Sequence, residues 1–314
     1  MIYTLNRIEL TLDCSTEKFN KLRSRAYDAD YTLADDGLEI EYRDSTYKKK
    51  IRIIMNPVIF ANDASGSMWN ANSGSIQKMI RKLEKLIDRC FGSKCKLNDF
   101  SVTHISFTAD IDVGSRKNVS AYIKVLRRIG KVKNFSPIQF KDYSHINNSN
   151  SFGLTGNSNG IEFIIFDKEA VSSEKDFKGI MGAEVLLTKQ KTIRKYTGAS
   201  TSTEQLERLA ANAKEIFLDT FVHIVPYGDF IKKKEAVRII EDSKLKRKSK
   251  NKMLRLLELI QKKKSLLLAQ KAMNDRNIEK IMTMFYELNI SPVVISKTQD
   301  VDYLDTLYMY LLDD

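Results

Sequence analysis

The sequence predicts an α+β protein, in which an antiparallel sheet with flanking helices is followed by a basic helical C-terminal unit. Short β-forming segments bounded by turn residues dominate the first part of the chain, and amphipathic helices separate them. Alternating apolar and polar patterns then disappear after Gly228. We therefore expect a strand-rich α+β domain over residues 1–228 and a helical unit over residues 229–314.

The first hundred residues predict three short strands and one helix. Segments 5–12, 38–42 and 50–54 are rich in β-formers and are bounded by Asp, Gly and Asn. Residues 62–75 are small and polar, which is typical of a loop. Apolar residues then repeat every three or four positions over 76–90, and Gly92 follows, so we expect a helix that ends there.

The segment 102–112, VTHISFTADID, is the clearest strand. Its apolar and polar residues alternate, so one face of the strand is apolar and the other is polar. A helix is expected over 116–129, a loop or irregular hairpin over 144–160, and strands over 161–166 and 180–187. A long helix follows over 203–221, with Ser202 as its cap, and four helices are expected over 232–242, 250–261, 265–274 and 277–288.

Composition places the chain among cytoplasmic globular proteins. It has 314 residues, of which 42% are hydrophobic, so a sizeable core can form. The N-terminus has no basic start followed by an apolar block, and no window approaches 18 consecutive apolar residues, so we expect neither a secretory signal nor a membrane partner. The three cysteines lack the spacing of a zinc site or a disulfide framework, which favours reduced thiols in the cytoplasm.

The positive charge of the chain is concentrated in one segment. The net charge is +12, and residues 231–271 hold 15 Lys and Arg against four acidic residues. A polyanionic partner such as DNA requires such a block, because each neutralised phosphate releases counterions. A solvated helix face and a contact with an anionic membrane are the alternatives. The residues that we expect to contact DNA are Lys232, Lys233, Lys234, Lys246, Arg247, Lys248, Lys250 and Lys252.

Acidic residues on the predicted strands are candidate metal ligands. Asp110 and Asp112 are two residues apart, so their side chains lie on the same face of a strand, about 6.5–7 Å apart along the chain. Such carboxylates suit Mg²⁺ or Mn²⁺, and a solvated face of a half-exposed strand is the alternative. Glu184 lies between apolar residues of a predicted strand, so it is either a metal ligand or the partner of a basic side chain. Asp167 is a further acid near these strands.

Tyrosines are the third group of candidate functional residues, and other catalytic templates are missing from the sequence. There is no phosphate loop ending in GK[ST], no GxGxxG after a strand and no HExxH, and the three histidines are scattered. Tyr196 stands out among 13 tyrosines because Arg194 and Lys195 precede it and could favour its phenolate. Packing against a helix is the alternative role for Tyr196, and Tyr143 and Tyr227 are the reserve candidates.

The order of several segments resembles the rolling-circle replication initiators of filamentous phages and of Gram-positive plasmids and mobile elements. The segments are VTHISFTADID, AYIKVLRRIGK, SNGIEFIIFDKEA and GAEVLLTKQKTIRKY, and the C-terminal runs KKKEAVRIIEDSKLKRKSKNKMLRLLELI and FYELNISPVVISKTQDVDYLDTL are also similar. The resemblance covers roughly residues 100–312.

The resemblance implies a replication-initiator nuclease-like fold and a DNA-nicking activity. An antiparallel sheet would carry a divalent metal, Mg²⁺ or Mn²⁺, with Asp110, Asp112 and Glu184 as ligands. Tyr196 would attack a phosphodiester and become linked to the 5′ end, and the freed 3′-OH would prime replication. The implied partner is origin DNA in a partly single-stranded form, with a host helicase as a further candidate.

The sequence also departs from the pattern of this family. It lacks the His-hydrophobic-His pair of the general class. Ser106 stands where the related pattern usually has Asp, and Phe166 stands where it usually has Tyr. These changes indicate a drifted site or one used only for binding, so a non-catalytic DNA-binding replication regulator on the same fold stays an alternative. An RNA-binding or structural protein is a third reading, which rests on the charge of the chain alone.

Overall fold

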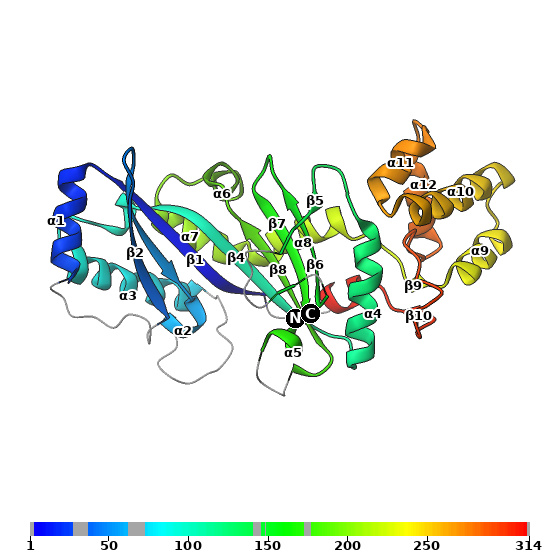
Figure 1. The fold of residues 1–314 in the computed structure, drawn as a ribbon, viewed down its shortest axis with the longest axis horizontal. Helices are drawn as coiled ribbons and strands as arrows, with labels where there is room; N and C mark the ends of the chain where they lie inside the picture. The colour runs from blue at the N-terminus through cyan, green and yellow to red at the C-terminus, as the bar shows by residue number, and fades with distance from the viewer. Residues whose placement is uncertain are drawn as a thin grey trace.

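The structure of the protein is a computed structural model, which describes residues 3–27, 37–61, 73–140, 146–147, 149–172 and 177–312. The molecule is elongated, with the first helices at one end, a large sheet in the middle and a helical unit at the other end (Figure 1). The described strands are β1 (Tyr3–Cys14), β2 (Leu38–Asp44), β3 (Lys49–Met55), β4 (Ser101–Asp112), β5 (Ser136–Pro137), β6 (Ser151–Gly156), β7 (Ile161–Asp167), β8 (Ile180–Leu187), β9 (Phe230–Ile231) and β10 (Tyr303–Leu304).

The helices lie between these strands and after them. Those before residue 228 are α1 (Thr16–Tyr27), α2 (Pro57–Ala61), α3 (Ser73–Phe91), α4 (Arg116–Leu126), α5 (Lys168–Val171), α6 (Gln190–Thr197), α7 (Ser202–Ala211) and α8 (Ala213–Ile224). Those after it are α9 (Lys233–Asp242), α10 (Arg247–Lys263), α11 (Leu266–Met273), α12 (Ile278–Glu287) and α13 (Leu307–Leu312). The 3₁₀ helices that the structure describes in full are Leu97–Asp99 and Arg127–Ile129.

Eight strands form one antiparallel sheet, in the order β2-β3-β1-β4-β8-β7-β6-β5. The predicted α+β class, an antiparallel sheet flanked by helices, is therefore confirmed. The strand predicted over 102–112 is β4, and it lies near the middle of the sheet between β1 and β8. This position brings its polar face next to polar residues of both neighbouring strands.

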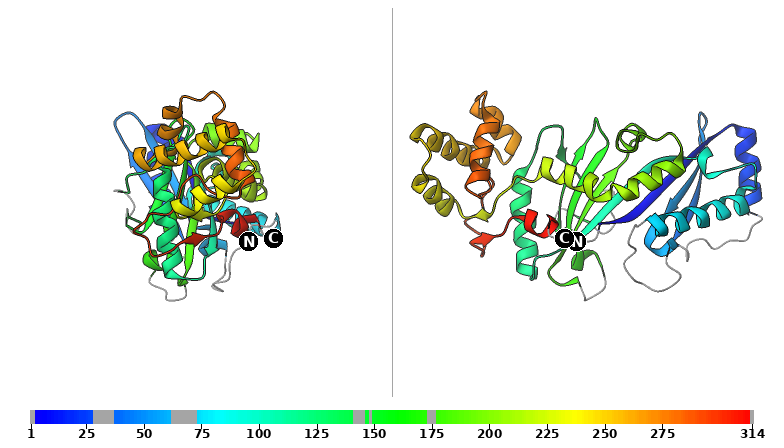
Figure 2. Two further views of the ribbon diagram at one scale, coloured as in Figure 1. Left: turned by 90° about the vertical axis from the view of Figure 1, so that its right-hand side faces the viewer. Right: turned by 180° about the vertical axis from the view of Figure 1, so that it is seen from behind.

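The two faces of the sheet differ in character. On one face, Phe107, Phe163 and Val185 are fully buried beneath helices α6 to α8. The ring of Phe217 in α8 lies 5.2 Å from Tyr3 of β1 and 6.4 Å from Phe163, measured between ring centroids. The right-hand view of Figure 2 shows α7 and α8 crossing this face. The opposite face, which we call the open face, is turned toward the viewer in Figure 1.

The C-terminal unit is helical, and the chain then returns to the sheet. Helices α9 to α12 gather at one end of the molecule, beside the small β9–β10 ladder (Figures 1 and 2). The Tyr122 hydroxyl donates to the carbonyl oxygen of Asp305 at 2.8 Å, and the Tyr3 hydroxyl donates to that of Leu311 at 2.7 Å. Helix α13 thus packs beside β1 and β4. The division at residue 228 stays a prediction, because the C-terminal residues contact both units.

Residues 144–160 were expected to form a loop or an irregular hairpin, and the antiparallel pairing of β6 with β7 matches the hairpin. Other local predictions were wrong. Helices α1 and α6 were missed. The single helix expected over 203–221 is two helices with Asn212 between them, and Thr201 caps α7 in place of Ser202, with its side chain accepting from the backbone of Glu204.

Candidate functional site on the open face of the sheet

A row of side chains crosses the open face at one level of the sheet. Ser106 of β4 pairs with Arg7 of β1 on one side and with Leu186 of β8 on the other. Leu186 pairs with Glu162 of β7, which in turn pairs with Thr155 of β6. Paired residues point to the same side of a sheet, with about 4.8 Å between strands. Five strands therefore contribute one side chain each to a continuous surface.

This row forms the floor of a pocket of about 600 Å³. The segment around β5 supplies one wall, because Pro137, Ile138 and Gln139 line the pocket. Gly153 lets this segment approach the sheet. A Cβ atom at Gly153 would lie 2.7 Å from the ring of Phe140 and 3.1 Å from Ile138. The remaining lining residues are Arg7, Glu9, His104, Ile105, Ser106, Thr155, Asn157, Glu162, Leu186 and Thr188.

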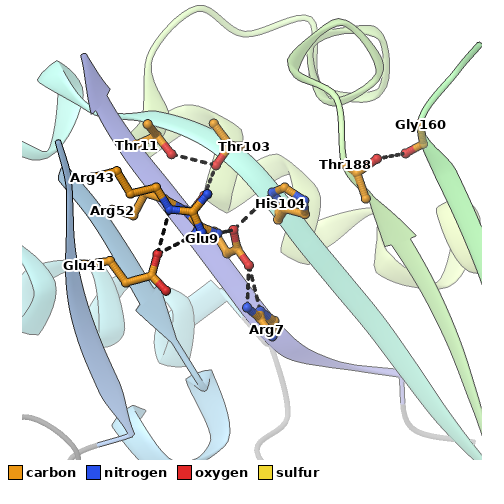
Figure 3. Close-up of polar contacts among 10 residues, drawn as sticks. All are labelled: Arg7, Glu9, Thr11, Glu41, Arg43, Arg52, Thr103, His104, Gly160 and Thr188. Carbon is orange, nitrogen blue, oxygen red and sulfur yellow. Dashed lines mark hydrogen bonds and ion pairs between the residues drawn. The ribbon is translucent and has the colours of Figure 1, made fainter. Parts of the chain in front are cut away.

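Glu9 is the centre of a charged network beside the pocket (Figure 3). Its side chain is only 4% exposed and forms ion pairs with Arg52 and Arg7, the latter at 2.6 Å. Arg52 also binds Glu41 of β2 at 2.5 Å. A buried charge is stable only when it is paired and hydrogen-bonded, so Glu9 and Arg52 depend on each other. The network links β1, β2 and β3 across the open face.

His104 and Glu9 have pKa values below their ordinary ranges. Burial by itself would raise the pKa of Glu9, but the hydrogen bond from Arg52 and nearby positive charges outweigh burial, so Glu9 is ionised at neutral pH. Burial lowers the pKa of His104, and this effect exceeds the attraction of Glu9. The Nδ1 atom of His104 lies 3.2 Å from Glu9 Oε2. Because His104 is neutral at pH 7, this is a polar contact rather than a full ion pair.

Ser106 presents an unused hydroxyl to the pocket. The residue is 1% exposed, and its Oγ makes no hydrogen bond of good geometry with any residue that the structure describes, although the Glu184 carboxylate lies close enough for Ser106 to affect the pKa of Glu184. The Nδ1 atom of His104 likewise lacks a hydrogen bond of good geometry within the described residues. Buried polar groups are normally hydrogen-bonded, so unpaired groups on a pocket floor point to a ligand or to water.

The predicted metal ligands do not form a common group. Asp110 is paired with Lys168, and Asp112 accepts the backbone N–H of Gly114 at 2.8 Å. Glu184 pairs with Thr108 in the sheet, whereas Asp110 pairs with Gly182. Within the described ranges, no three His, Cys, Asp or Glu side chains gather closely enough to hold a metal ion. The predicted convergence is therefore not found there.

The two further acids on these strands have their own local explanations. Asn6 lies 3.4 Å from the Glu184 carboxylate, to which it donates. Burial raises the pKa of Glu184, and the nearby Ser106 and Asn6 only partly oppose this effect. The Asp167 side chain caps α5 by accepting from the backbone of Glu169 and Ala170. The local structure thus gives Asp167 a capping role, and the metal role of Glu184 stays a prediction.

Tyr196 lies on a helix rather than beside the acids. Its hydroxyl donates to Asp219 of α8 at 2.9 Å, and α8 covers the face of the sheet opposite to Glu184. Burial and the hydrogen bond to Asp219 raise the pKa of Tyr196. Burial and Asp219 thus act against the phenolate, and the expected help from Arg194 and Lys195 stays a prediction.

The reserve tyrosines differ in what the structure says of them. The ring of Tyr227 packs at an angle between two other tyrosine rings, with ring centroids 4.4 Å from Tyr286 and 5.0 Å from Tyr308. Tyr143 lies outside the described residues. Phe166, which stands where the resembling family usually has Tyr, points toward the open face and lies over Gly182. None of the described tyrosines lines the pocket.

The predicted DNA-binding residues separate into two groups. Lys232 donates to the carbonyl oxygen of Ser296 at 2.8 Å, Lys250 donates to that of Glu241 at 2.6 Å, and Lys252 pairs with Asp275. These three serve intramolecular contacts. The others make no ion pair with any residue in the described part of the chain, and most are exposed: Lys233, Lys234, Lys246, Arg247 and Lys248.

Sequence reasoning missed Glu9, Arg7 and the role of His104. The signal was present for Glu9, which stands between Ile8 and Leu10 in a predicted strand, as Glu184 stands between Ala183 and Val185. Acidic side chains are rarely buried without a partner, and this argument, which was made for Glu184, holds equally for Glu9. Its partner Arg52 could not be found in the same way, because that pairing depends on the order of the strands.

No family model and no curated protein matches the chain. Among solved structures, it is similar to a rolling circle replication initiator protein from Geobacillus stearothermophilus, with 10% sequence identity and a TM-score of 0.37. The match covers 71% of this chain and 85% of that one. A likeness of this extent does not establish a shared site. None of the described helices is long and apolar enough to cross a bilayer.

Proposed function

We propose that this chain is a DNA-binding protein that acts in rolling-circle replication. The observation that carries the proposal is the group of free cations around the start of α10, where Lys246, Arg247 and Lys248 are all exposed and make no ion pair in the described part of the chain. Unpaired, clustered cations are what a phosphate backbone requires. The family resemblance of the sequence adds the role in replication.

The finer proposal is that the protein nicks and rejoins one strand of an origin through a tyrosine–5′-phosphate intermediate. Tyr196 remains the candidate nucleophile. Asp219 lies 2.9 Å from its hydroxyl and is positioned to accept the proton when the oxygen attacks phosphorus. The attack forms the tyrosyl phosphodiester bond and releases a 3′-OH, so the number of phosphodiester bonds is unchanged. The described acids do not fit a shared metal site, and the use of Mg²⁺ or Mn²⁺ stays a prediction.

The nicking proposal predicts that Tyr196→Phe abolishes covalent attachment to DNA. The change removes only the hydroxyl and keeps the ring, which is half-buried. We expect wild-type protein, incubated with supercoiled DNA that carries the origin and with Mn²⁺, to leave an adduct that survives denaturing electrophoresis. Asp219→Asn should slow adduct formation by about 10²-fold, since it removes the proton acceptor but retains a hydrogen-bond partner.

Tyr227→Phe is the matched control, because it removes a hydroxyl from a tyrosine that is stacked away from Asp219. If Tyr196→Phe still forms the adduct at the wild-type rate, Tyr196 is not the nucleophile. Tyr227→Phe and Tyr143→Phe then become the next variants to assay.

A second candidate function is a non-catalytic DNA-binding replication regulator on the same fold. The position of Tyr196 favours it, because its hydroxyl is held by α8 while Glu184 and Asp110 lie on the open face. The absence of any adduct from wild-type protein, together with specific binding to origin DNA, would support this candidate.

A further inference from the structure

The pocket on the open face offers both hydrogen-bond donors and acceptors. The Ser106 hydroxyl can donate and accept, and it makes no hydrogen bond of good geometry within the described residues, so it can turn from the neighbouring Glu184 carboxylate to a ligand. The hydroxyl of Thr188 donates to the carbonyl oxygen of Gly160 at 3.0 Å and keeps its lone pairs as acceptors. His104 is neutral, so one of its ring nitrogens donates and the other accepts. A ligand that matches this floor must itself carry donors and acceptors close together.

Two common ligand classes do not match the pocket. A metal ion needs several acidic or imidazole ligands, and no such group of three exists in the part of the chain that the structure describes. A phosphate needs unpaired cations. Arg7 is the cation among the described lining residues, and Glu9 already binds it at 2.6 Å. The pocket therefore fits a neutral polar group better than an ion.

The size and the apolar walls of the pocket add a second constraint. Leu186 on the floor is half-buried, and Pro137 and Ile138 form part of the wall. Apolar surfaces of this kind suit a flat ring, whereas the hydroxyl groups suit its polar edge. A volume of about 600 Å³ lies within the range of small-ligand pockets and accommodates one nucleotide.

We propose that this pocket binds one unstacked nucleobase of a single-stranded DNA segment that lies on the open face of the sheet. The inference rests on the proposed function, since it takes DNA as the source of the base. Ser106 hydrogen-bonds to the edge of the base, and Leu186 contacts its ring. The free cations of α10 lie in the separate helical unit, so duplex DNA and the unpaired base are bound by different parts of the chain (Figure 1).

Two substitutions in the full-length protein test the pocket. Ser106→Ala removes the unpaired hydroxyl, and we expect it to weaken binding of single-stranded DNA about three- to tenfold, the loss expected for one hydrogen bond. Leu186→Trp fills the pocket from a half-buried position, and we expect a loss of at least about tenfold. The single-stranded probes are fluorescent homopolymers of dA, dC or dT, each about 12 nucleotides long, and the double-stranded probe is a duplex of the same length. Fluorescence anisotropy measures the affinity of the protein for each probe.

Ser101→Ala is the matched control. It removes a serine hydroxyl from the same strand, β4, at a half-exposed position that does not line the pocket. We expect the control to bind all probes as wild type does. Both pocket variants should keep the wild-type affinity for duplex DNA and the wild-type melting temperature to within a few degrees.

Free nucleotides separate a failure of the pocket from a failure of the proposed function. If the wild type binds no DNA but binds dAMP or dCMP, and Ser106→Ala weakens that binding, the pocket is a nucleotide site and the DNA function is wrong. If the wild type binds DNA and both pocket variants bind single strands unchanged, the nucleobase inference is wrong and the DNA function stands. Binding of neither probe by the wild type overturns both.

Discussion

Replacing Lys246, Arg247 and Lys248 together with Gln is expected to weaken duplex DNA binding by about 10²- to 10³-fold at moderate salt. These cations are exposed and make no ion pair with the described residues, so each is available to a phosphate. Each lost phosphate contact lowers the slope of log affinity against log salt by about 0.9, so the slope should fall by up to about 2.7. Titration of one duplex at four or five salt concentrations measures both quantities.

Arg247 and Lys250 form a matched pair for the same experiment. Both lie in α10, but the Lys250 ammonium already donates to the carbonyl oxygen of Glu241, whereas Arg247 has no such partner in the described structure. Arg247→Gln should lower the salt slope by about 0.9, and Lys250→Gln should leave it nearly unchanged. If both changes lowered the salt slope equally, DNA binding would depend only on the total charge of the protein. An unchanged slope in the triple variant would place the DNA-binding surface elsewhere.

Glu9→Gln is expected to destabilise the protein by about 2–4 kcal/mol at pH 7. The Glu9 side chain is 4% exposed and neutralises Arg52, whose side chain is only 13% exposed. In the Glu9→Gln variant the new amide is neutral, so the mostly buried guanidinium of Arg52 keeps one carboxylate partner, Glu41. Breaking one partner of a buried ion pair typically costs 3–5 kcal/mol, and Glu41 reduces that cost here. Urea-induced unfolding of both proteins gives the difference.

The pH dependence of that difference has a defined sign. The pKa of Glu9 in the folded protein lies below its ordinary value of 4.5, so ionised Glu9 contributes its full stability above pH 4.5. The contribution is lost as the pH falls from 4.5 through the folded-state pKa. Wild type and Glu9→Gln should therefore converge in stability under acid conditions.

Glu41→Gln is the control, because the Glu41 carboxylate is 31% exposed, and it should lower the free energy of unfolding less than Glu9→Gln does. A constant difference from pH 7 to pH 3 would contradict the assigned role of Glu9.

The sequence was most informative where structure depends on local patterns. The alternation in 102–112 identified β4, and the loss of alternation after Gly228 identified the helical unit. Strand β6 was expected only as part of a loop or an irregular hairpin, because SFGLTG has two apolar residues, Phe152 and Leu154, among small and polar ones. Its pairing with β7 determines its conformation. Tertiary context thus overrode a weak local preference.

The candidate site depended on information that no local pattern contains. Asp110 and Glu184 were expected together, and the register of β4 against β8 does make them diagonal neighbours on one face, but Lys168 pairs with Asp110, and no local pattern contains that contact. The hydroxyl of Tyr196 was expected near the acids, but the packing of α6 against α7 and of α7 against α8 directs it to Asp219. Register and helix packing both arise from residues far apart in the sequence.

The hydrogen bond from Tyr3 to the carbonyl oxygen of Leu311 means that the two ends of the chain lie together, as Figure 1 also shows. The backbone could therefore be closed into a ring by a short linker and reopened elsewhere. The turn between β2 and β3 is a suitable opening, since Tyr47 at its tip is 94% exposed. Such a circularly permuted chain should fold with the same sheet order.

A protein that is cut at residue 228 would instead lose α13 and expose the apolar surface beside β1 and β4. Replacing residues 232–288 with a linker would therefore separate the sheet from the helical unit better than truncation.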